Sequence, residues 1–136
     1  MIAIVDAGPL YAAIDADDED HLRSLEVLER ADLDLVVPAL VVAEVTYLLG
    51  RRLGAQVEAA FLRGLTGFDV EAPEPQDWPL IAELVDRYAN FPLGGTDASV
   101  AALAERLQTD LVVTLDRRHF SAIRRRDGGS FRILPD

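Results

Sequence analysis

The sequence contains no cysteine and no lysine, and it has only two histidines, His21 and His119. Without cysteine the chain cannot form disulfides, thiolate zinc sites or a cysteine nucleophile. Without lysine it cannot use any mechanism that needs a catalytic or phosphate-binding lysine, and all 13 basic residues are arginines. The groups that remain for acid–base or metal chemistry are mainly the 24 aspartates and glutamates.

Long hydrophobic runs are also absent. The longest apolar stretches, at residues 36–45 and 2–5, are much shorter than the roughly 18 residues that a membrane-spanning helix requires. Met1 is not followed by a basic segment and a cleavage site, as a secretory signal would be. We therefore expect a soluble, cytoplasmic protein, and a chain of 136 residues predicts one domain over residues 1–136.

The formal net charge is −11, so the surface as a whole should repel nucleic acid. This counts against a general nucleic-acid-binding module. It does not exclude an enzyme that contacts RNA at one metal-loaded site, because a bound divalent cation changes the local field. The exposed arginines are better explained as a solvated surface than as RNA contacts, although the second interpretation stays open for residues 51, 52, 117, 118 and 124–126.

Short apolar runs alternate with helical patterns along the whole chain. The runs predict strands at residues 2–5, 35–37, 68–70, 111–115 and 131–134. Helical spacing and turn residues predict helices at residues 9–14, 18–31, 39–53, 56–65 and 76–88, one capped by Thr96 and reaching Leu107, and a short one ending at Ile123. Strands of this kind alternating with helices indicate an α/β fold with a parallel sheet covered on both faces.

Two aspartates follow predicted strands, Asp6 after the first and Asp116 after the fourth. Open parallel sheets bind ligands beyond the carboxyl ends of their strands, where the strand order reverses. The two side chains would therefore face one site if these strands were neighbours. Taken singly, each is better explained as a turn residue or a helix cap.

Two more acids belong to predicted helices. Glu44 is surrounded at helical spacing by Leu40, Val41, Tyr47 and Leu48, so we expect it to project from the face that packs into the core. A buried carboxylate needs a cation, hydrogen bonds or an ion pair, for which Arg51 is a candidate. Asp97 lies at a helix start, where a negative charge is favourable in any protein.

The convergence of four acids from separate elements is harder to explain by chance. Four carboxylates in one place repel one another, so they require cations unless they are protonated. Oxygen ligands with no cysteine and no histidine near these segments favour Mg²⁺, or Mn²⁺, over zinc. A hard cation held in this way suits hydrolysis of a phosphodiester.

Four sequence blocks resemble the PIN-domain family, and more narrowly the VapC-type toxins of bacterial toxin–antitoxin pairs. They are Ile-Val-Asp-Ala at residues 4–7, Val-Ala-Glu-Val at 42–45, Gly-Thr-Asp-Ala-Ser at 95–99 and Val-Thr-Leu-Asp-Arg-Arg-His-Phe at 113–120. The resemblance covers essentially the whole chain. It implies a five-stranded parallel sheet between helices and a Mg²⁺-dependent endoribonuclease that acts on transfer or ribosomal RNA.

The same resemblance implies roles for the four acids and for partners. Asp6, Glu44, Asp97 and Asp116 would be catalytic, with Asp6 and Asp97 as the principal metal ligands and with Asp116 and Glu44 completing the site directly or through water. A homodimer and an inhibiting antitoxin (VapB-type) would be its protein partners. An acidic toxin suits a basic partner segment.

Other interpretations of the same residues stay open. A histidine beside Phe120 is more often structural than catalytic, so we expect His119 to be structural. The acids could instead belong to a binding module that holds a metal ion or a basic partner without cleaving RNA. The nuclease chemistry could also serve housekeeping RNA processing rather than a toxin.

Overall fold

The computed structural model describes residues 1–136. Its five strands are β1 (Ile2–Val5), β2 (Asp34–Pro38), β3 (Asp69–Glu71), β4 (Leu111–Val113) and β5 (Arg132–Leu134). They form one sheet with the order β3-β2-β1-β4-β5, in which every neighbouring pair is parallel. The predicted α/β fold with a five-stranded parallel sheet is confirmed.

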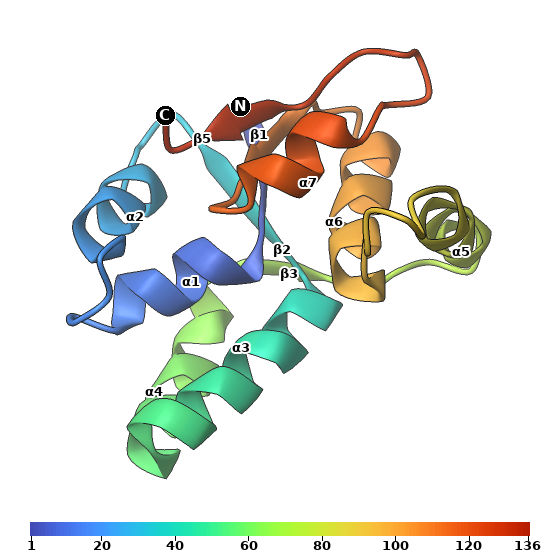
Figure 1. Cartoon of the computed structure of the whole chain (residues 1–136). Coiled ribbons are helices and arrows are strands. Elements are labelled where there is room, and N and C mark those ends of the chain that lie inside the picture. Colours follow the sequence, from blue (N-terminus) through green and yellow to red (C-terminus); the bar gives the residue numbers. More distant parts are fainter.

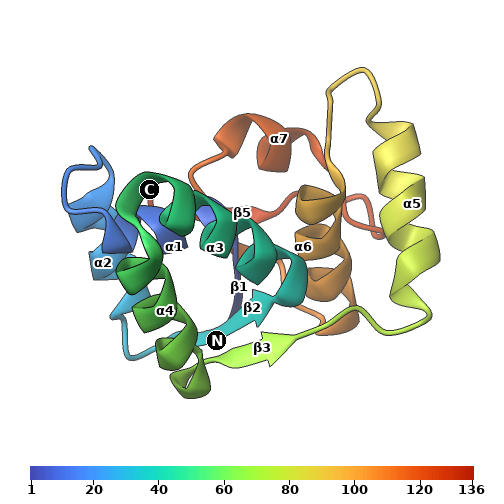
Figure 2. The same ribbon diagram turned by 90° about the horizontal axis from the view of Figure 1, so that it is seen from below.

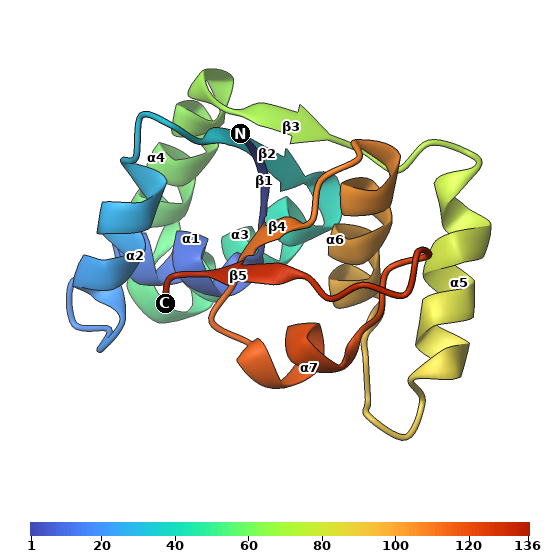
Figure 3. The same ribbon diagram turned by 90° about the horizontal axis from the view of Figure 1, so that it is seen from above.

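Seven helices connect the strands (Figure 1). They are α1 (Ala7–Ile14), α2 (His21–Leu28), α3 (Ala39–Leu53), α4 (Ala55–Gly64), α5 (Asp77–Arg87), α6 (Gly95–Arg106) and α7 (Arg117–Ala122), with a single 3-10 turn, η1 (Leu65–Gly67), before β3. In Figures 2 and 3, α1, α2 and α4 lie to one side of the central strand β1 and α5 to α7 lie mainly to the other, while α3 begins near α6 and passes across β1 toward α4. This division is expected of right-handed crossovers, because the chain moves outward from β1 through β2 to β3 and then returns to the other side of β1.

The strand order reverses between β1 and β4. The registers Ile4↔Val112 and Val5↔Val113 place the ends of these two strands side by side. The condition under which Asp6 and Asp116 would share a site is therefore met. This point is where ligands bind in open parallel sheets.

The core explains why the central strands are so apolar. Ala3, Ile4 and Val5 of β1 are fully buried, and the buried apolar side chains form one cluster across the sheet and both helical layers. A strand covered on both faces does not need to alternate polar and apolar residues. None of the helices combines the length and apolar character needed to cross a membrane.

Several predicted boundaries shift by a few residues, and one cap is wrong. Thr96 lies inside α6, whose N-cap is Gly94 in an extended conformation, with no side-chain cap. The second helix is much shorter than the predicted residues 18–31, because Asp18 and Asp20 form a turn in which Asp18 Oδ1 accepts from the Asp20 amide at 2.8 Å. Aspartate forms such local hydrogen bonds in competition with a helix.

Candidate active site

Asp6 lies at the junction of β1 and α1, with only 6% of the residue exposed. Its backbone amide donates to the Val113 carbonyl at 2.9 Å, which extends the β1–β4 ladder by one step. In this register Asp6 stands beside Thr114, the residue after β4, and the buried Thr114 hydroxyl donates to Asp6 Oδ2 at 2.7 Å. One side-chain hydrogen bond therefore fixes the carboxylate at the switch point of the sheet.

Burial raises the pKa of Asp6 above its ordinary value, because a carboxylate loses hydration there. The Thr114 hydroxyl and the Ala7 amide act in the opposite direction, and the neighbouring charge of Asp116 adds to the rise. The raised pKa means that the hydrogen bonds from the protein do not fully replace the hydration that the Asp6 carboxylate loses on burial. A cation would supply the missing stabilisation.

Asp116 follows Thr114 by two residues and is the N-cap of α7. Its amide donates to Thr114 Oγ1 at 3.0 Å, so one hydroxyl contacts both strand-end aspartates. Its carboxylate accepts from the His119 amide at 3.1 Å through Oδ1, while Oδ2 lies 2.6 Å from Nδ1 of the same histidine. The cap interpretation is correct for Asp116, and its charge lies near enough to Asp6 to raise the pKa of that carboxylate.

Asp97 lies in the first turn of α6 and is partly buried. Its pKa is raised to about 6 by burial first and then by the charges of Asp6, Asp116 and Glu44, while His119 lowers it. The positive end of the α6 dipole favours a carboxylate at this position. Asp97 is therefore the acid on which the charges of the other three acids converge.

Glu44 reaches the same group from α3, which packs against α1 and α6. The prediction that Glu44 projects into the core is wrong. The core face of α3 is Val41, Val45 and Leu49, all fully buried, whereas Glu44 is exposed. Partial burial and the charge of Asp6 nonetheless raise its pKa, so Glu44 lies at the open edge of the site.

His119 adds an imidazole to the group of acids, which was not predicted from the sequence. One ligand atom each from Asp97, Asp116 and His119 lie within 4.8 Å of one another. The expectation of no histidine near these acids is therefore wrong. Both ring nitrogens already have partners, because Nε2 lies 2.7 Å from the Phe91 carbonyl and Nδ1 contacts Asp116. The ring links α7 to the loop that precedes α6, which supports the structural interpretation of this histidine.

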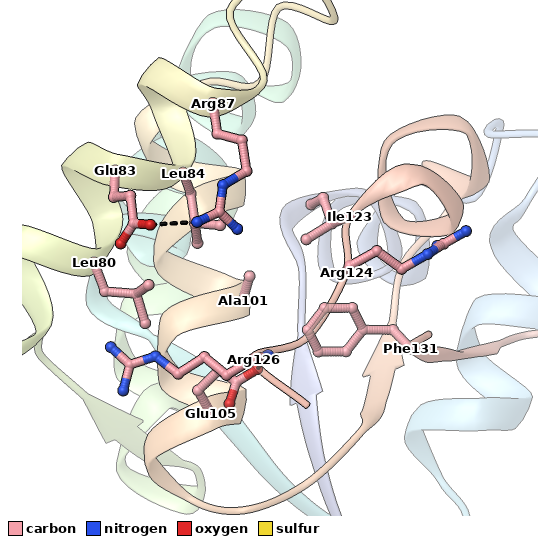
Figure 4. A pocket seen from close by; sticks show the side chains of 10 residues that line it. All are labelled: Leu80, Glu83, Leu84, Arg87, Ala101, Glu105, Ile123, Arg124, Arg126 and Phe131. Atoms are coloured by element: carbon pink, nitrogen blue, oxygen red, sulfur yellow. Dashed lines mark hydrogen bonds and ion pairs between the residues drawn. The ribbon is translucent and has the colours of Figure 1, made fainter. Parts of the chain in front are cut away.

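None of the four acids lines the pocket of Figure 4. That pocket lies between α5, α6 and the C-terminal segment, has a volume of about 60 Å³ and contains none of the four acids. Its rim carries charges that are partly paired, such as the Glu83–Arg87 ion pair drawn in Figure 4. Glu44 is exposed and Asp97 and Asp116 are partly exposed, so the acids are accessible from solvent without an enclosing pocket. Such a site suits a polymeric substrate better than a small molecule that must be enclosed.

Sequence reasoning missed Thr114 and Phe91. Thr114 carries a recognisable signal, because it is the one polar residue between the apolar strand β4 and Asp116. Phe91 carries none, since it is connected to the site only by contacts with His119 and Arg118, which are distant from it in the sequence.

The arginines near the site differ in whether they already form hydrogen bonds or ion pairs within the chain. Arg117 donates to the Pro135 carbonyl, Arg124 to the Ser121 carbonyl, and Arg125 pairs with Asp127. Arg118 forms no ion pair, and its guanidinium lies over the Phe91 ring. Arg118 is therefore the cationic side chain beside Asp116 that remains available to a ligand.

With this geometry established, comparison with known proteins identifies the class. The chain matches the PIN domain over residues 3–126. It is 37% identical over 134 residues to Ribonuclease VapC26 of Mycobacterium tuberculosis, a match that covers 97% of this chain and 99% of the relative.

Solved structures agree with this fold. M. tuberculosis VapC20, described as a Sarcin-Ricin loop cleaving toxin, superposes with a TM-score of 0.74 at 21% identity, covering 82% of this chain and 87% of that one. VapBC2 of Rickettsia felis, solved bound to a DNA fragment from its promoter, gives 0.72 at 17% identity over 99% and 100% of the two chains. This chain belongs to the PIN-domain family, and its similarity to VapC26 places it with the VapC-type members of that family.

Proposed function

We propose that this chain is a Mg²⁺-dependent endoribonuclease and the toxin of a toxin–antitoxin pair. The observation that carries the proposal is the gathering of the acids at one place. Thr114 Oγ1 contacts both the Asp6 carboxylate and the Asp116 amide, and Asp97 and Asp116 offer ligand atoms within 4.8 Å of each other. Glu44 is near enough for the charge of Asp6 to raise its pKa. These acids come from four separate elements. The relatives named as ribonuclease and toxin support the reaction and its biological role.

The proposed metal follows from the chemistry of the donors. Asp6 and Asp97 would be the principal ligands, with Asp116 and Glu44 completing the site directly or through water. The three aspartates fit a hard cation because each lies at a helix start, where its charge is favoured. Burial also leaves Asp6 and Asp97 short of hydration. His119 does not favour zinc here, since both of its nitrogens have partners within the chain.

The chain's own groups have distinct tasks in the proposed reaction. When bound, Mg²⁺ would supply Lewis acidity to the phosphodiester and to the attacking water. Thr114 holds Asp6, and His119 holds Asp116, so neither carboxylate must reorganise when a substrate arrives. Exposed Glu44 lies where it can contact water and accept a proton.

The proposed substrate is structured RNA of the transfer or ribosomal kind. The sarcin–ricin-loop activity named for VapC20 supports ribosomal RNA as one candidate. The proposed partners are an antitoxin, supported by the toxin–antitoxin complexes among the structural neighbours, and a second copy of this chain in a homodimer. Placement in the cytoplasm and organisation as one domain over residues 1–136 complete the proposal.

Cleavage of total bacterial RNA by the purified, antitoxin-free protein tests the proposal. We expect discrete products with Mg²⁺ or Mn²⁺ and none with EDTA. Asp6→Asn and Asp97→Asn should each lower the rate about 100-fold or more, since the metal site supplies several kcal/mol of transition-state stabilisation. Asparagine has nearly the same size as aspartate and can still accept a hydrogen bond, so the fold should persist.

Asp86→Asn is the matched control, because it removes one charge from an exposed position on α5. It should cleave like the unmodified chain. Cleavage that survives EDTA, or that all three variants retain equally, would exclude the proposed site. If the folded protein binds Mg²⁺ but cleaves no RNA in any metal, the non-catalytic binding module is the better interpretation.

A further inference from the structure

Partly exposed Phe91 and exposed Arg118 form a pair beside the acidic site. Phe91 belongs to the loop between α5 and α6, and Arg118 to the first turn of α7, two segments that lie next to each other in Figure 3. The guanidinium carbon of Arg118 lies 5.1 Å from the centroid of the Phe91 ring. Arg118 is exposed and has no carboxylate partner, although the chain holds 24 acidic residues.

The position of this pair is fixed relative to the acids by His119. The imidazole packs edge-on against the Phe91 ring, with centroids 5.1 Å apart and an interplanar angle of 81°. The same imidazole contacts the Phe91 carbonyl at 2.7 Å and Asp116 Oδ2 at 2.6 Å. One ring therefore separates the Phe91–Arg118 pair from an acid of the proposed metal site.

The loop itself is anchored rather than free. The Phe91 amide donates to the Tyr88 carbonyl at 2.9 Å, and Leu93 is buried with 3% of the residue exposed. Phe91 stays partly exposed between these two attachments. The Phe91 ring is thus held in place, lies against the Arg118 guanidinium and remains partly exposed to solvent. Together the ring and the guanidinium are a preorganised stacking surface.

Such a surface has a chemical match in RNA. Unpaired bases stack on aromatic rings and on arginine guanidinium planes, and this contact is available only where the base is not paired in a helix. A phosphate alone would use the charge of Arg118 and not the Phe91 ring. The ring makes the base, rather than the backbone, the better fit.

We propose that Phe91 and Arg118 form a stacking subsite for an unpaired base next to the phosphodiester that is cleaved. This inference rests on the proposed ribonuclease function and adds a source of selectivity to it. The subsite would favour cut sites in loops and bulges over those in uninterrupted duplex. Phe91 and Arg118 would bind the substrate without taking part in the bond-breaking step.

The test compares variants that keep size or charge and lose stacking. The substrate is an RNA hairpin that contains one cut site identified in total RNA, made with a normal base or with an abasic nucleotide beside the cut. We expect Phe91→Leu and Arg118→Lys each to raise KM for the normal hairpin about tenfold, with kcat changed less than about twofold. Phe91→Trp should retain a low KM.

The abasic hairpin separates stacking from other effects. It should raise KM of the unmodified chain by a similar factor and cause little further loss in Phe91→Leu, because both changes remove the same contact. Arg63→Lys, an exposed position on α4, is the control for arginine replacement and should have no effect. Additive losses, or an Arg118→Lys variant that binds normally while Arg118→Gln does not, would overturn stacking in favour of a phosphate contact.

A second measurement does not depend on cleavage. It uses an RNA hairpin with a 2-aminopurine in its unpaired loop, which needs no mapped cut site. The unmodified chain with Mg²⁺ should quench the fluorescence of this 2-aminopurine, and Phe91→Leu should not. Quenching without cleavage would refute the proposed nuclease and retain the subsite. Cleavage without quenching, and with KM unchanged in the variants, would refute the subsite and retain the nuclease, while absence of both would refute both.

Discussion

At the level of single residues, Thr114 connects the two strand-end aspartates. It is 1% exposed, donates to Asp6 and accepts from the Asp116 amide. Thr114→Val keeps the shape but leaves both groups without that partner, so we expect a loss of about 1–3 kcal/mol in the free energy of unfolding. Because the Thr114 hydroxyl lowers the pKa of Asp6, the variant should also bind Mg²⁺ more weakly at neutral pH.

Thr114→Ser is the matched variant, since it keeps the hydroxyl and removes only a methyl group. It should lose about 1 kcal/mol in stability and bind Mg²⁺ like the unmodified chain. Urea unfolding in EDTA and Mg²⁺ titration by calorimetry measure the two effects. Equal Mg²⁺ affinity in both variants would show that the hydroxyl does not tune the site.

The raised pKa of Asp97 predicts how stability depends on pH without metal. Asp97 has a pKa of about 6 in the folded chain, against an ordinary value of 3.8. Between these two values the folded chain binds more protons at Asp97 than the unfolded chain does. The free energy of unfolding therefore falls as pH rises from 3.8 to about 6, and it stays lower above that range.

Asp97→Asn should remove this loss of stability, because asparagine carries no charge at any pH. In EDTA at about pH 8 we expect the variant to be more stable by about 1–2 kcal/mol, after allowance for solvent screening, with the difference vanishing below about pH 4. Added Mg²⁺ should stabilise the unmodified chain and have little effect on the variant. Urea unfolding across this pH range, beside Asp86→Asn, measures the difference. A variant that is less stable than the unmodified chain at pH 8 in EDTA contradicts the assignment.

These residues also show what the sequence can predict about a site. Asp6 and Asp116 are predictable because a strand end is a local pattern. The exposure of Glu44 was wrongly predicted because the face of α3 that is buried depends on how α1 and α6 pack against it, and apolar residues surround the helix on more than one side. The contact of His119 with Phe91 joins residues 28 positions apart and has no local signal.

At the level of elements, the α3–α4 connection depends on one glycine. Gly54 has φ 95° and ψ 169°, a backbone conformation that side chains disfavour, and it caps α3 and starts α4. Gly54→Ala should therefore lower the free energy of unfolding by about 1–3 kcal/mol, although no atom would lie within 4 Å of the added carbon.

Gly64, at the end of α4, has an ordinary helical backbone conformation, so alanine should have the opposite effect on stability there. Its φ is −68°, and an added carbon also meets no atom within 4 Å. Gly64→Ala should stabilise the chain by up to about 1 kcal/mol, because it reduces the freedom of the unfolded state. Denaturant unfolding of the two variants checks the pair. The same sign for both changes would show that backbone conformation does not decide the outcome.

Element types were more predictable than element ends. The helix at residues 39–53 is predicted to the residue, because Pro38 and Gly54 mark both of its ends. The second helix is not, because aspartates near residue 18 suit either a helix start or a turn, and the hydrogen bond that decides between them is visible only in the structure.

At the level of the whole molecule, strand order is the feature that local patterns cannot provide. A parallel sheet follows from alternating strands and helices, but the order β3-β2-β1-β4-β5 depends on contacts between distant segments. The family resemblance supplied the architecture, and the pairing of β1 with β4 then brings Asp6 and Asp116 together. The site is therefore a product of topology more than of any one motif.

The net charge of −11 acts at the same scale and predicts how the proposed antitoxin binds. A strongly acidic chain should attract a basic partner segment over distances longer than a contact, and salt screens this attraction, with a Debye length of about 10 Å at 0.1 M. For an antitoxin of the proposed kind, we expect the association rate constant to fall about tenfold or more between about 50 and about 500 mM NaCl. The dissociation rate constant, which depends on short-range contacts, should change much less.

Neutral replacements far from the acidic site separate this long-range effect from direct contacts. A variant that combines Glu26→Gln, Glu29→Gln and Asp86→Asn loses three exposed charges, on or beside α2 and on α5, and leaves the four proposed ligands intact. It should associate more slowly at low salt and approach the unmodified chain at high salt, because screening removes the same interaction that the substitutions remove. Stopped-flow mixing measures both rate constants. An association rate that does not change with salt, or that rises, would mean that the partner does not use the acidic charge of this chain for recognition, and its binding would then have to depend on apolar contacts instead.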